Sequence, residues 1–133
     1  MNEPIQRFED IIAWQKARVL TREVYLATKR ETFRKDFGLA NQIQRAAVSV
    51  MANIAEGYER HGQGEFYHFL GTAKASCAEV GSHLYVALDV GYLTQSQFDA
   101  LHRQVNEVGR ILGSFRAAVG RNRKDGSPSR SPE

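Results

Sequence analysis

The chain has 133 residues, of which 42% are hydrophobic and 25% are charged. This length fits one domain and is too short for two independently stable ones, and the composition excludes wholesale disorder and a membrane protein. The formal net charge is +3, but residues 121–133 alone carry +2 of it, so the remainder is close to neutral. Net charge by itself therefore does not establish a nucleic-acid partner.

The N-terminal residues lead into no apolar segment of signal-peptide length, and no run of 18 apolar residues occurs in the sequence. We therefore expect a cytoplasmic protein with no membrane partner. Cys77 is the only cysteine, which excludes an intramolecular disulfide and a thiolate cluster for zinc or iron–sulfur. We predict a small, reduced residue of the core or of an interface.

The first predicted helix runs from about Glu9 to Lys29, where apolar residues recur at steps of three and four. The mixed charges of residues 30–37 interrupt that pattern and lead to Gly38, which predicts a connecting loop. A second helix is predicted from about Leu39 to Arg60. Alanine and glycine on its inner face keep that face thin.

Two glycines in the sequence His61-Gly62-Gln63-Gly64 predict a tight turn, because glycine adopts a positive φ at no steric cost. The third predicted helix runs from about Glu65 to Val90 and closes at Gly91 in a left-handed conformation. The fourth opens at Thr94, which with Gln97 has the spacing of a capping box. Its regular apolar stripe ends at Gly120.

Four helices with short connections predict an all-α fold, an up-down-up-down antiparallel four-helix bundle made of residues 1–120. The remaining residues, 121–133, are basic and rich in serine and proline and contain almost no apolar side chains. Such a segment cannot bury enough surface to order itself. We predict that it is a disordered, basic C-terminal tail.

A helical bundle raises the question of a di-metal site, which needs a Glu-x-x-His pair from each of two helices. Glu65 and His68 form one such pair, whereas Glu79 and His83 have the wrong spacing for a second. No phosphate-binding loop, dinucleotide-binding glycine motif or nucleophile elbow is present. We therefore predict no catalytic residue, no metal and no cofactor, and a metal-dependent enzyme built on these four residues is the third-ranked hypothesis.

A polar stripe follows one face of the second predicted helix at steps of four, four, three and four, beside the apolar face. It is either a solvated face with intrahelical ion pairs or a polar seam that packs against another helix or subunit. Its middle member is flanked by apolar residues, which favours partial burial. The stripe consists of Arg45, Ser49, Asn53, Glu56 and Arg60.

Basic residues gather in the first predicted helix and the loop after it, with only Glu23 and Glu31 among them. They are either a solvated outer face or a set of phosphate contacts whose affinity falls steeply with salt. Together with basic residues after Gly120 they are the candidate nucleic-acid-binding residues. The set is Lys16, Arg18, Arg22, Lys29, Arg30, Arg34, Lys35, Arg121, Arg123 and Lys124.

The segment 42–57, QIQRAAVSVMANIAEG, closely resembles the signature of the four-helix-bundle proteins encoded in 23S rRNA intervening sequences. The opening Phe8-Glu9-Asp10, the Trp14-Gln15-Lys16-Ala17 element and the Phe66-Tyr67-x-Phe69-Leu70 element are similar to that family as well. The resemblance extends from about Phe8 to Val119.

This resemblance implies a homopentameric, barrel-like ring in a family without an established enzymatic activity. It also implies a relationship to the accessory variability protein of diversity-generating retroelements, which binds a reverse transcriptase and nucleic acid through a basic surface. We therefore expect a non-enzymatic homo-oligomer that acts as an accessory factor for RNA or DNA, or for a reverse-transcriptase-like partner. The alternative is a protein–protein scaffold with no nucleic-acid role.

Overall fold

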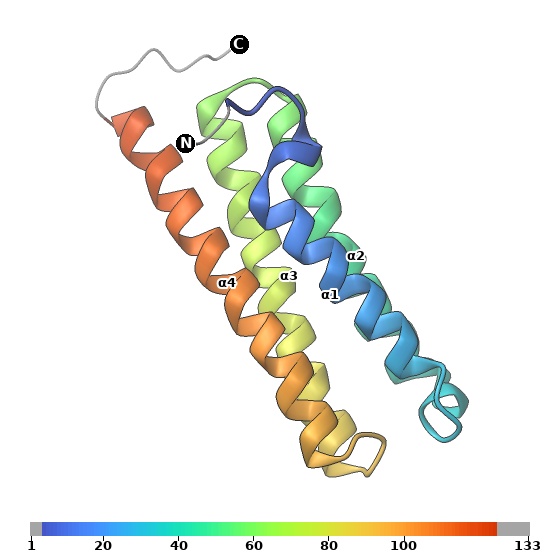
Figure 1. Cartoon of the computed structure of the whole chain (residues 1–133). Helices are drawn as coiled ribbons and strands as arrows, with labels where there is room; N and C mark the ends of the chain where they lie inside the picture. The colour runs from blue at the N-terminus through green and yellow to red at the C-terminus, as the bar shows by residue number, and fades with distance from the viewer. Residues whose placement is uncertain (1–3, 125–133) are drawn as a thin grey trace.

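The computed structural model describes residues 4–124, which form four α-helices joined by short connections (Figure 1). No strand occurs among these residues, so the predicted all-α four-helix bundle is confirmed. The helices are α1 (Ile12–Thr28), α2 (Phe37–Glu59), α3 (Gln63–Asp89) and α4 (Gln95–Lys124), with the short 3-10 helices η1 (Phe8–Asp10) before α1 and η2 (Phe33–Lys35) before α2.

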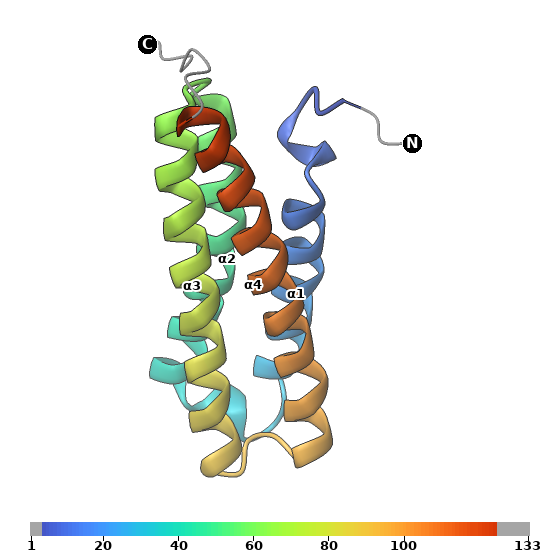
Figure 2. The same ribbon diagram turned by 90° about the vertical axis from the view of Figure 1, so that its left-hand side faces the viewer.

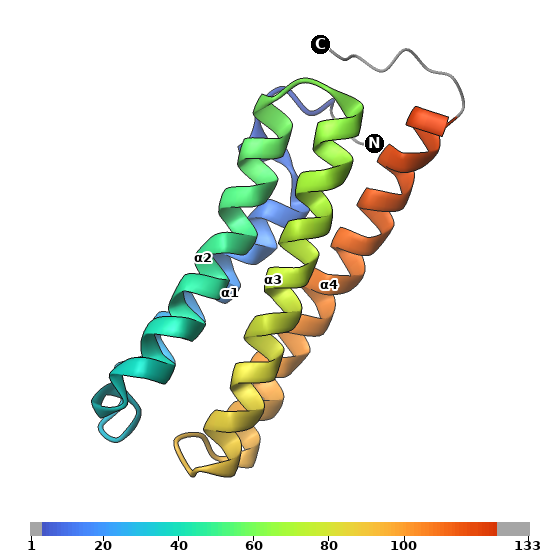
Figure 3. The ribbon, with the colours of Figure 1, turned by 180° about the vertical axis from the view of Figure 1, so that it is seen from behind.

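Consecutive helices run in opposite directions, so the described chain begins and ends at the same end of the bundle (Figure 1). Turning the molecule shows α1 beside α4 (Figure 2), and the view from behind shows α2 and α3 in front of the other two helices (Figure 3). The α1–α2 and α3–α4 connections lie together at the opposite end, which we call the loop end (Figure 1). None of the helices in residues 4–124 combines the length and the apolar character needed to cross a membrane.

The tightest contact joins α2 to α3, because the inner face of α2 carries small side chains. Ala46 and Ala47 are buried there, and Gly57 lies so close to Phe69 that an added Cβ would be 2.6 Å from the Cβ of Phe69. Two glycines inside α3 lie against α4: an added Cβ would be 3.3 Å from a methyl group of Val105 at Gly81, and 2.9 Å from the guanidinium of Arg116, the end of a flexible side chain, at Gly71. Contacts within the bundle therefore account for these glycines.

Local signals correctly predicted two helix boundaries. The Thr94 side chain accepts a hydrogen bond from the backbone N–H of Gln97 (3.1 Å), and the Gln97 side chain accepts one from the N–H of Thr94 (2.9 Å). This is the predicted capping box. Gly91 has a φ of +87°, as its predicted position at the end of α3 requires.

The predicted turn glycines are not the residues with a positive φ. His61 has a φ of 63°, whereas Gly62 is the extended N-cap residue of α3 and Gly64 lies inside that helix. The turn exists, but helix α3 begins two residues earlier than its predicted start at Glu65.

The predicted end of the fourth helix at Gly120 is wrong, because α4 continues to Lys124. Gly120 is buried, and an added Cβ would be 2.7 Å from the ring of Tyr67. This position needs a glycine for the close approach of α3, and that need is independent of helix termination. The predicted tail therefore loses residues 121–124 to the helix, and its remainder, 125–133, lies outside the described residues.

Two glycine substitutions are expected to change stability in opposite directions. Gly57→Ala forces a methyl group against Phe69, and overpacking of this kind costs about 1–3 kcal/mol. Gly109 lies in α4 with nothing within 4 Å of an added Cβ, so Gly109→Ala is expected to raise stability by up to about 1 kcal/mol through helix propensity. Urea denaturation of both variants measures the two shifts, and equal shifts would contradict the close α2–α3 approach.

Candidate functional site

The outer face of α1 carries the first three candidate basic residues. The ammonium of Lys16 lies 3.2 Å from the carboxylate of Glu107 and joins α1 to α4. Arg22 pairs with its neighbour Glu23 at 3.3 Å, whereas the guanidinium of Arg18 lies 5.7 Å from the ring centroid of Trp14. Arg18 therefore remains without a carboxylate partner among the described residues.

The other four basic residues of this cluster lie at the loop end, where the net charge is positive. Arg34 and Lys35 share the carboxylate of Glu31, at 3.3 and 3.7 Å. Lys29 and Arg30 form no ion pair within the described part of the chain. Since exposed ion pairs contribute only about 0–1 kcal/mol, Glu31 does not prevent Arg34 and Lys35 from binding another anion.

A hollow of about 450 Å³ lies between the end of α1, η2 and the start of α2, and we call it the loop-end pocket. Its residues include a hydrogen-bonded pair, in which the side-chain amide of Gln44 donates to the hydroxyl of Thr28 at 2.8 Å. The aromatic residue Phe37 also lines the pocket, and it is 81% exposed. The lining residues are Thr28, Lys29, Arg34, Phe37, Ala40, Asn41 and Gln44.

A stacked aromatic pair, buried Phe33 and half-buried Tyr92, joins the two connections of the loop end next to this pocket. Phe33 of η2 is fully buried and stacks on Tyr92 of the α3–α4 connection, with ring centroids 5.0 Å apart. Tyr92 also donates a hydrogen bond to the carboxylate of Asp36 (2.8 Å), which in turn caps α2 by accepting from the backbone N–H of Leu39 (3.1 Å). The two connections are thus joined through Asp36, the residue before Phe37.

The electrostatics of this joint favour an ionised carboxylate. The backbone N–H of Leu39 and then the hydroxyl of Tyr92 lower the pKa of Asp36 below its ordinary value. The same hydrogen bond to Asp36, together with burial, raises the pKa of Tyr92. The hydrogen bond between the two side chains is therefore strongest when Asp36 is charged and Tyr92 is neutral.

The structure does not bring the C-terminal basic residues to this cluster. Arg121 is exposed near the C-terminal end of α4, and the backbone of Arg123 and Lys124 completes that helix. A helix of 30 residues is about 45 Å long. The candidate residues Lys29, Arg30, Arg34 and Lys35 therefore lie at the opposite end of the bundle from Arg121 (Figure 1), whereas Lys16, Arg18 and Arg22 lie along α1.

The polar stripe on α2 divides into two parts. Half-buried Asn53 donates to the backbone carbonyl (2.8 Å) and the hydroxyl (3.0 Å) of Ser49, and the Ser49 hydroxyl lies 2.9 Å from that of Ser76 on α3. These three side chains form a small polar cluster between α2 and α3. Arg45 is exposed and has no ion-pair partner among the described residues.

The end of the stripe is a surface ion-pair group. Arg60 contacts the carboxylates of Glu56 (3.0 Å) and Glu65 (3.4 Å), and its guanidinium lies over the ring of Phe69 at 5.2 Å. The Glu56 hydrogen bond is the main cause that raises the pKa of Arg60. These contacts join the end of α2 to the start of α3.

The residues of the metal hypothesis are not assembled. Glu79 lies 3.3 Å from His83 on the same helix, while Glu65 is engaged by Arg60. In residues 4–124 no group of three or more His, Cys, Asp and Glu side chains is placed to hold a metal ion. Cys77 is 2% exposed, and burial raises the pKa of its thiol to about 11, so it is a core residue rather than a reactive thiol.

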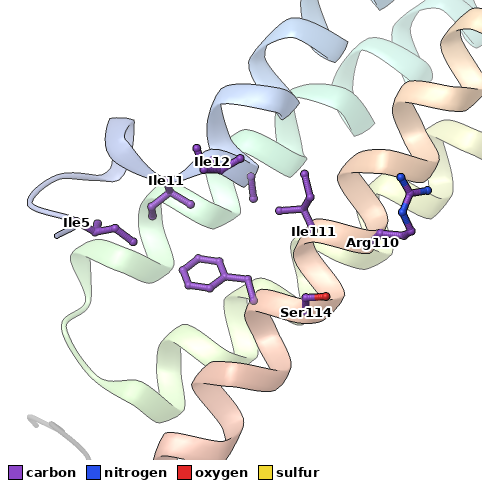
Figure 4. A pocket seen from close by; sticks show the side chains of 8 residues that line it. Ile5, Ile11, Ile12, Arg110, Ile111 and Ser114 are labelled. Carbon is purple, nitrogen blue, oxygen red and sulfur yellow. The ribbon is translucent and has the colours of Figure 1, made fainter. Parts of the chain in front are cut away.

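An apolar groove lies between α1 and α4, with a volume of about 620 Å³. Figure 4 shows Ile5, Ile11 and Ile12 on one side and Ile111, Ser114 and Arg110 on the other. Ile12 is 56% exposed and begins an apolar stripe on α1 that continues at steps of seven through Val19 (48%) and Leu26 (51%). The full lining is Ile5, Ile11, Ile12, Ala13, Arg110, Ile111, Ser114 and Phe115.

Sequence reasoning identified the basic residues of the loop end but not the pocket beside them. The sequence predicts a connecting loop for residues 30–37, and this prediction includes neither the burial of Phe33 nor the exposure of Phe37. One signal was available, because Asp is preferred at a helix N-cap and Asp36 comes shortly before the apolar stripe that begins at Leu39. It places Phe37 in the first turn of α2, away from the buried stripe.

Comparisons with known proteins agree with this architecture. Residues 9–114 match the family model of the 23S rRNA-intervening sequence proteins. A solved structure from Bacteroides thetaiotaomicron VPI-5482, a protein with unknown function from the S23 ribosomal protein family, is similar with a TM-score of 0.73. The two share 22% sequence identity over 79% of this chain and 98% of the other. No curated protein matches the sequence.

The hydrogen bond between Asp36 and Tyr92 is expected to make the free energy of unfolding depend on pH. Because the folded-state pKa of Asp36 lies below 3.8, its stabilisation is complete above that value and is lost as the pH falls through the folded-state pKa. Asp36→Asn should therefore be less stable than the parent at pH 7, with the difference shrinking below about pH 4. Thermal melts from pH 7 to pH 2 measure this, with Asp99→Asn as the control. A difference that is constant with pH would contradict the joint.

Proposed function

The chain belongs to the family of 23S rRNA-intervening sequence proteins, and we propose that it is a non-enzymatic, self-assembling accessory factor that binds nucleic acid through the outer face of α1 and the loop end. One observation carries the proposal: Arg18, Lys29 and Arg30 have no carboxylate partner within residues 4–124, and all three lie on α1 or directly after it. Unpaired cations on one side of a bundle attract the phosphate backbone. The site of action is the cytoplasm, as the sequence predicts.

The local charge balance supports this binding mode. Residues 29–36 contain Lys29, Arg30, Arg34 and Lys35 against Glu31 and Asp36, which is a net charge of +2. Asp36 is already occupied by Tyr92 and by the backbone of α2. The cations on this end therefore have little internal compensation, and phosphates would supply it.

We assign no catalytic step to this chain. The nearest approach to a catalytic pair is Glu79 with His83, which is an ordinary i,i+4 contact on one helix. The family comparison and the structural relative give no activity to place there, since the relative's function is unknown.

Self-assembly is the second element of the proposal. The exposed stripe of Ile12, Val19 and Leu26 borders the apolar groove at Ile12, and large exposed apolar surfaces favour association. A second copy of the chain is the occupant we propose, and a five-membered ring is the assembly expected from the resemblance in sequence. Each copy would add another loop end to the assembly, so weak phosphate contacts would combine into a usable affinity.

The alternative function is a protein–protein scaffold with no nucleic-acid role, and the same groove is the observation that favours it. A cleft lined by isoleucines and Phe115 has the apolar character of a groove for an amphipathic helix. In that case an unlike protein takes the place of the second copy. The basic residues then serve solubility.

Nucleic-acid binding is expected to weaken with salt. Three phosphate contacts, one for each unpaired cation, predict a loss of about 20-fold in single-strand affinity between 50 and 200 mM salt. Fluorescence anisotropy with a labelled single-stranded RNA measures this. Lys29→Gln with Arg30→Gln should weaken binding and flatten the salt dependence.

The control removes a cation from α3, outside both the basic cluster and the apolar groove, as Lys74→Gln. This control is expected to bind within about twofold of the parent. A chain that ends at Lys124 tests residues 125–133 separately. Absence of binding by the parent at 50 mM salt would reject the nucleic-acid function and favour the scaffold.

Assembly is expected to depend on the α1 stripe. Light scattering of the parent at micromolar concentration should give roughly five chain masses. Val19→Glu places a carboxylate in the middle of the stripe and should reduce the mass to that of a smaller species without unfolding the helix, because Val19 is 48% exposed. The control is Val48→Glu on α2, which is 43% exposed. A monomer mass for the parent would reject the assembly.

A further inference from the structure

We propose that the loop-end pocket binds one unpaired nucleotide, with its base stacked on Phe37 and its flanking phosphates held by Lys29 and Arg34. This inference rests on the proposed nucleic-acid function and assigns to it a site and a preference for single strands. Phe37 is not among the candidate residues identified from the sequence, and its ring makes no aromatic contact within residues 4–124.

The first step is the state of the Phe37 ring. It is 81% exposed, more than any other large apolar side chain in the described residues. Its aromatic neighbours are already engaged, since Phe33 stacks on Tyr92. The ring of Phe37 has no aromatic partner within residues 4–124, so this largely exposed residue is available to a planar ligand.

The second step is the character of the pocket beside the ring. A volume of about 450 Å³ lies in the range of small-ligand sites. The hydrogen bond from Gln44 to Thr28 fixes two of its polar side chains, while the exposed amide of Asn41 makes no hydrogen bond within the described part of the chain. An amide without a partner has both a donor and an acceptor for the edge of a base.

The third step is the charge that surrounds the pocket. Lys29 and Arg34 both line it, Lys29 without an ion pair and Arg34 in an exposed pair with Glu31. An aromatic ring flanked by cations is the combination by which proteins bind single strands, because bases stack on the ring and cations follow the phosphates. In a duplex the bases are stacked on one another, so the inference predicts a preference for unpaired strands.

The rival occupant is an apolar side chain of another protein copy. That contact would cover Phe37 but would also remove Lys29 from water without giving it an anion, which is unfavourable. A nucleotide supplies a base that stacks on the ring and phosphates that pair with the cations. The charge of the pocket lining therefore favours the nucleotide.

The test compares two labelled probes, a 12-nucleotide oligouridylate and an abasic strand of the same length, by anisotropy at 50 mM salt. Phe37→Ala should weaken oligouridylate binding by about 5- to 150-fold, the range for loss of one stacked base. Binding of the abasic strand should change by less than about twofold. Phe37→Leu keeps the apolar bulk and should behave like Phe37→Ala, whereas Phe37→Trp should bind like the parent, with tryptophan emission quenched by oligouridylate.

Val90→Ala is the matched control, since Val90 is an exposed apolar residue (56%) at the same end of the bundle. It should leave the affinities for both probes unchanged. If the parent and Phe37→Ala bind oligouridylate with equal affinity, the inference is overturned and the proposed function stands. Full binding by Phe37→Leu, or a changed light-scattering mass in Phe37→Ala, would overturn it in favour of a protein contact. A parent that binds neither probe would instead reject the proposed function.

Discussion

The close approach of α2 to α3 is the constraint on which the bundle depends. Gly57 and the inner alanines of α2 leave no room for larger side chains, so the two backbones come near enough for the hydroxyls of Ser49 and Ser76 to meet at 2.9 Å. A buried polar group requires a partner, and this spacing provides one. Larger apolar side chains fill the space between this helix pair and the helices α1 and α4. The outer faces of α1 and α4 carry charged side chains.

The sequence was sufficient where a structural feature has a local cause. The periodicity of apolar residues, the Thr94 capping box and the positive φ of Gly91 all arise within a few residues, and each was predicted correctly. Gly120 shows the limit of this reasoning. Gly120 has no side chain because the ring of Tyr67, distant in the sequence, packs against it. A rule based on neighbouring residues predicts a helix end at this glycine instead.

The candidate site shows the same division. Its cations are a cluster in the sequence, and their neighbourhood was recognisable without a structure. The pocket is not local, because it depends on a contact between Asp36 and Tyr92, which are 56 residues apart. Phe33 is buried through the same contact, and the chain then turns so that Phe37 remains outside. The N-cap signal of Asp36 concerns only the start of α2, so the burial of Phe33, which depends on this distant contact, could not be predicted from the sequence.

The described chain starts and finishes at one end of a rod about 45 Å long, and Phe37 lies at the other end. A fusion partner or surface tether joined to either terminus would therefore leave the loop end facing the solvent. Copies immobilised in this way would present their basic ends outward in a common orientation, which makes the bundle suitable as a spacer that displays the surface of interest.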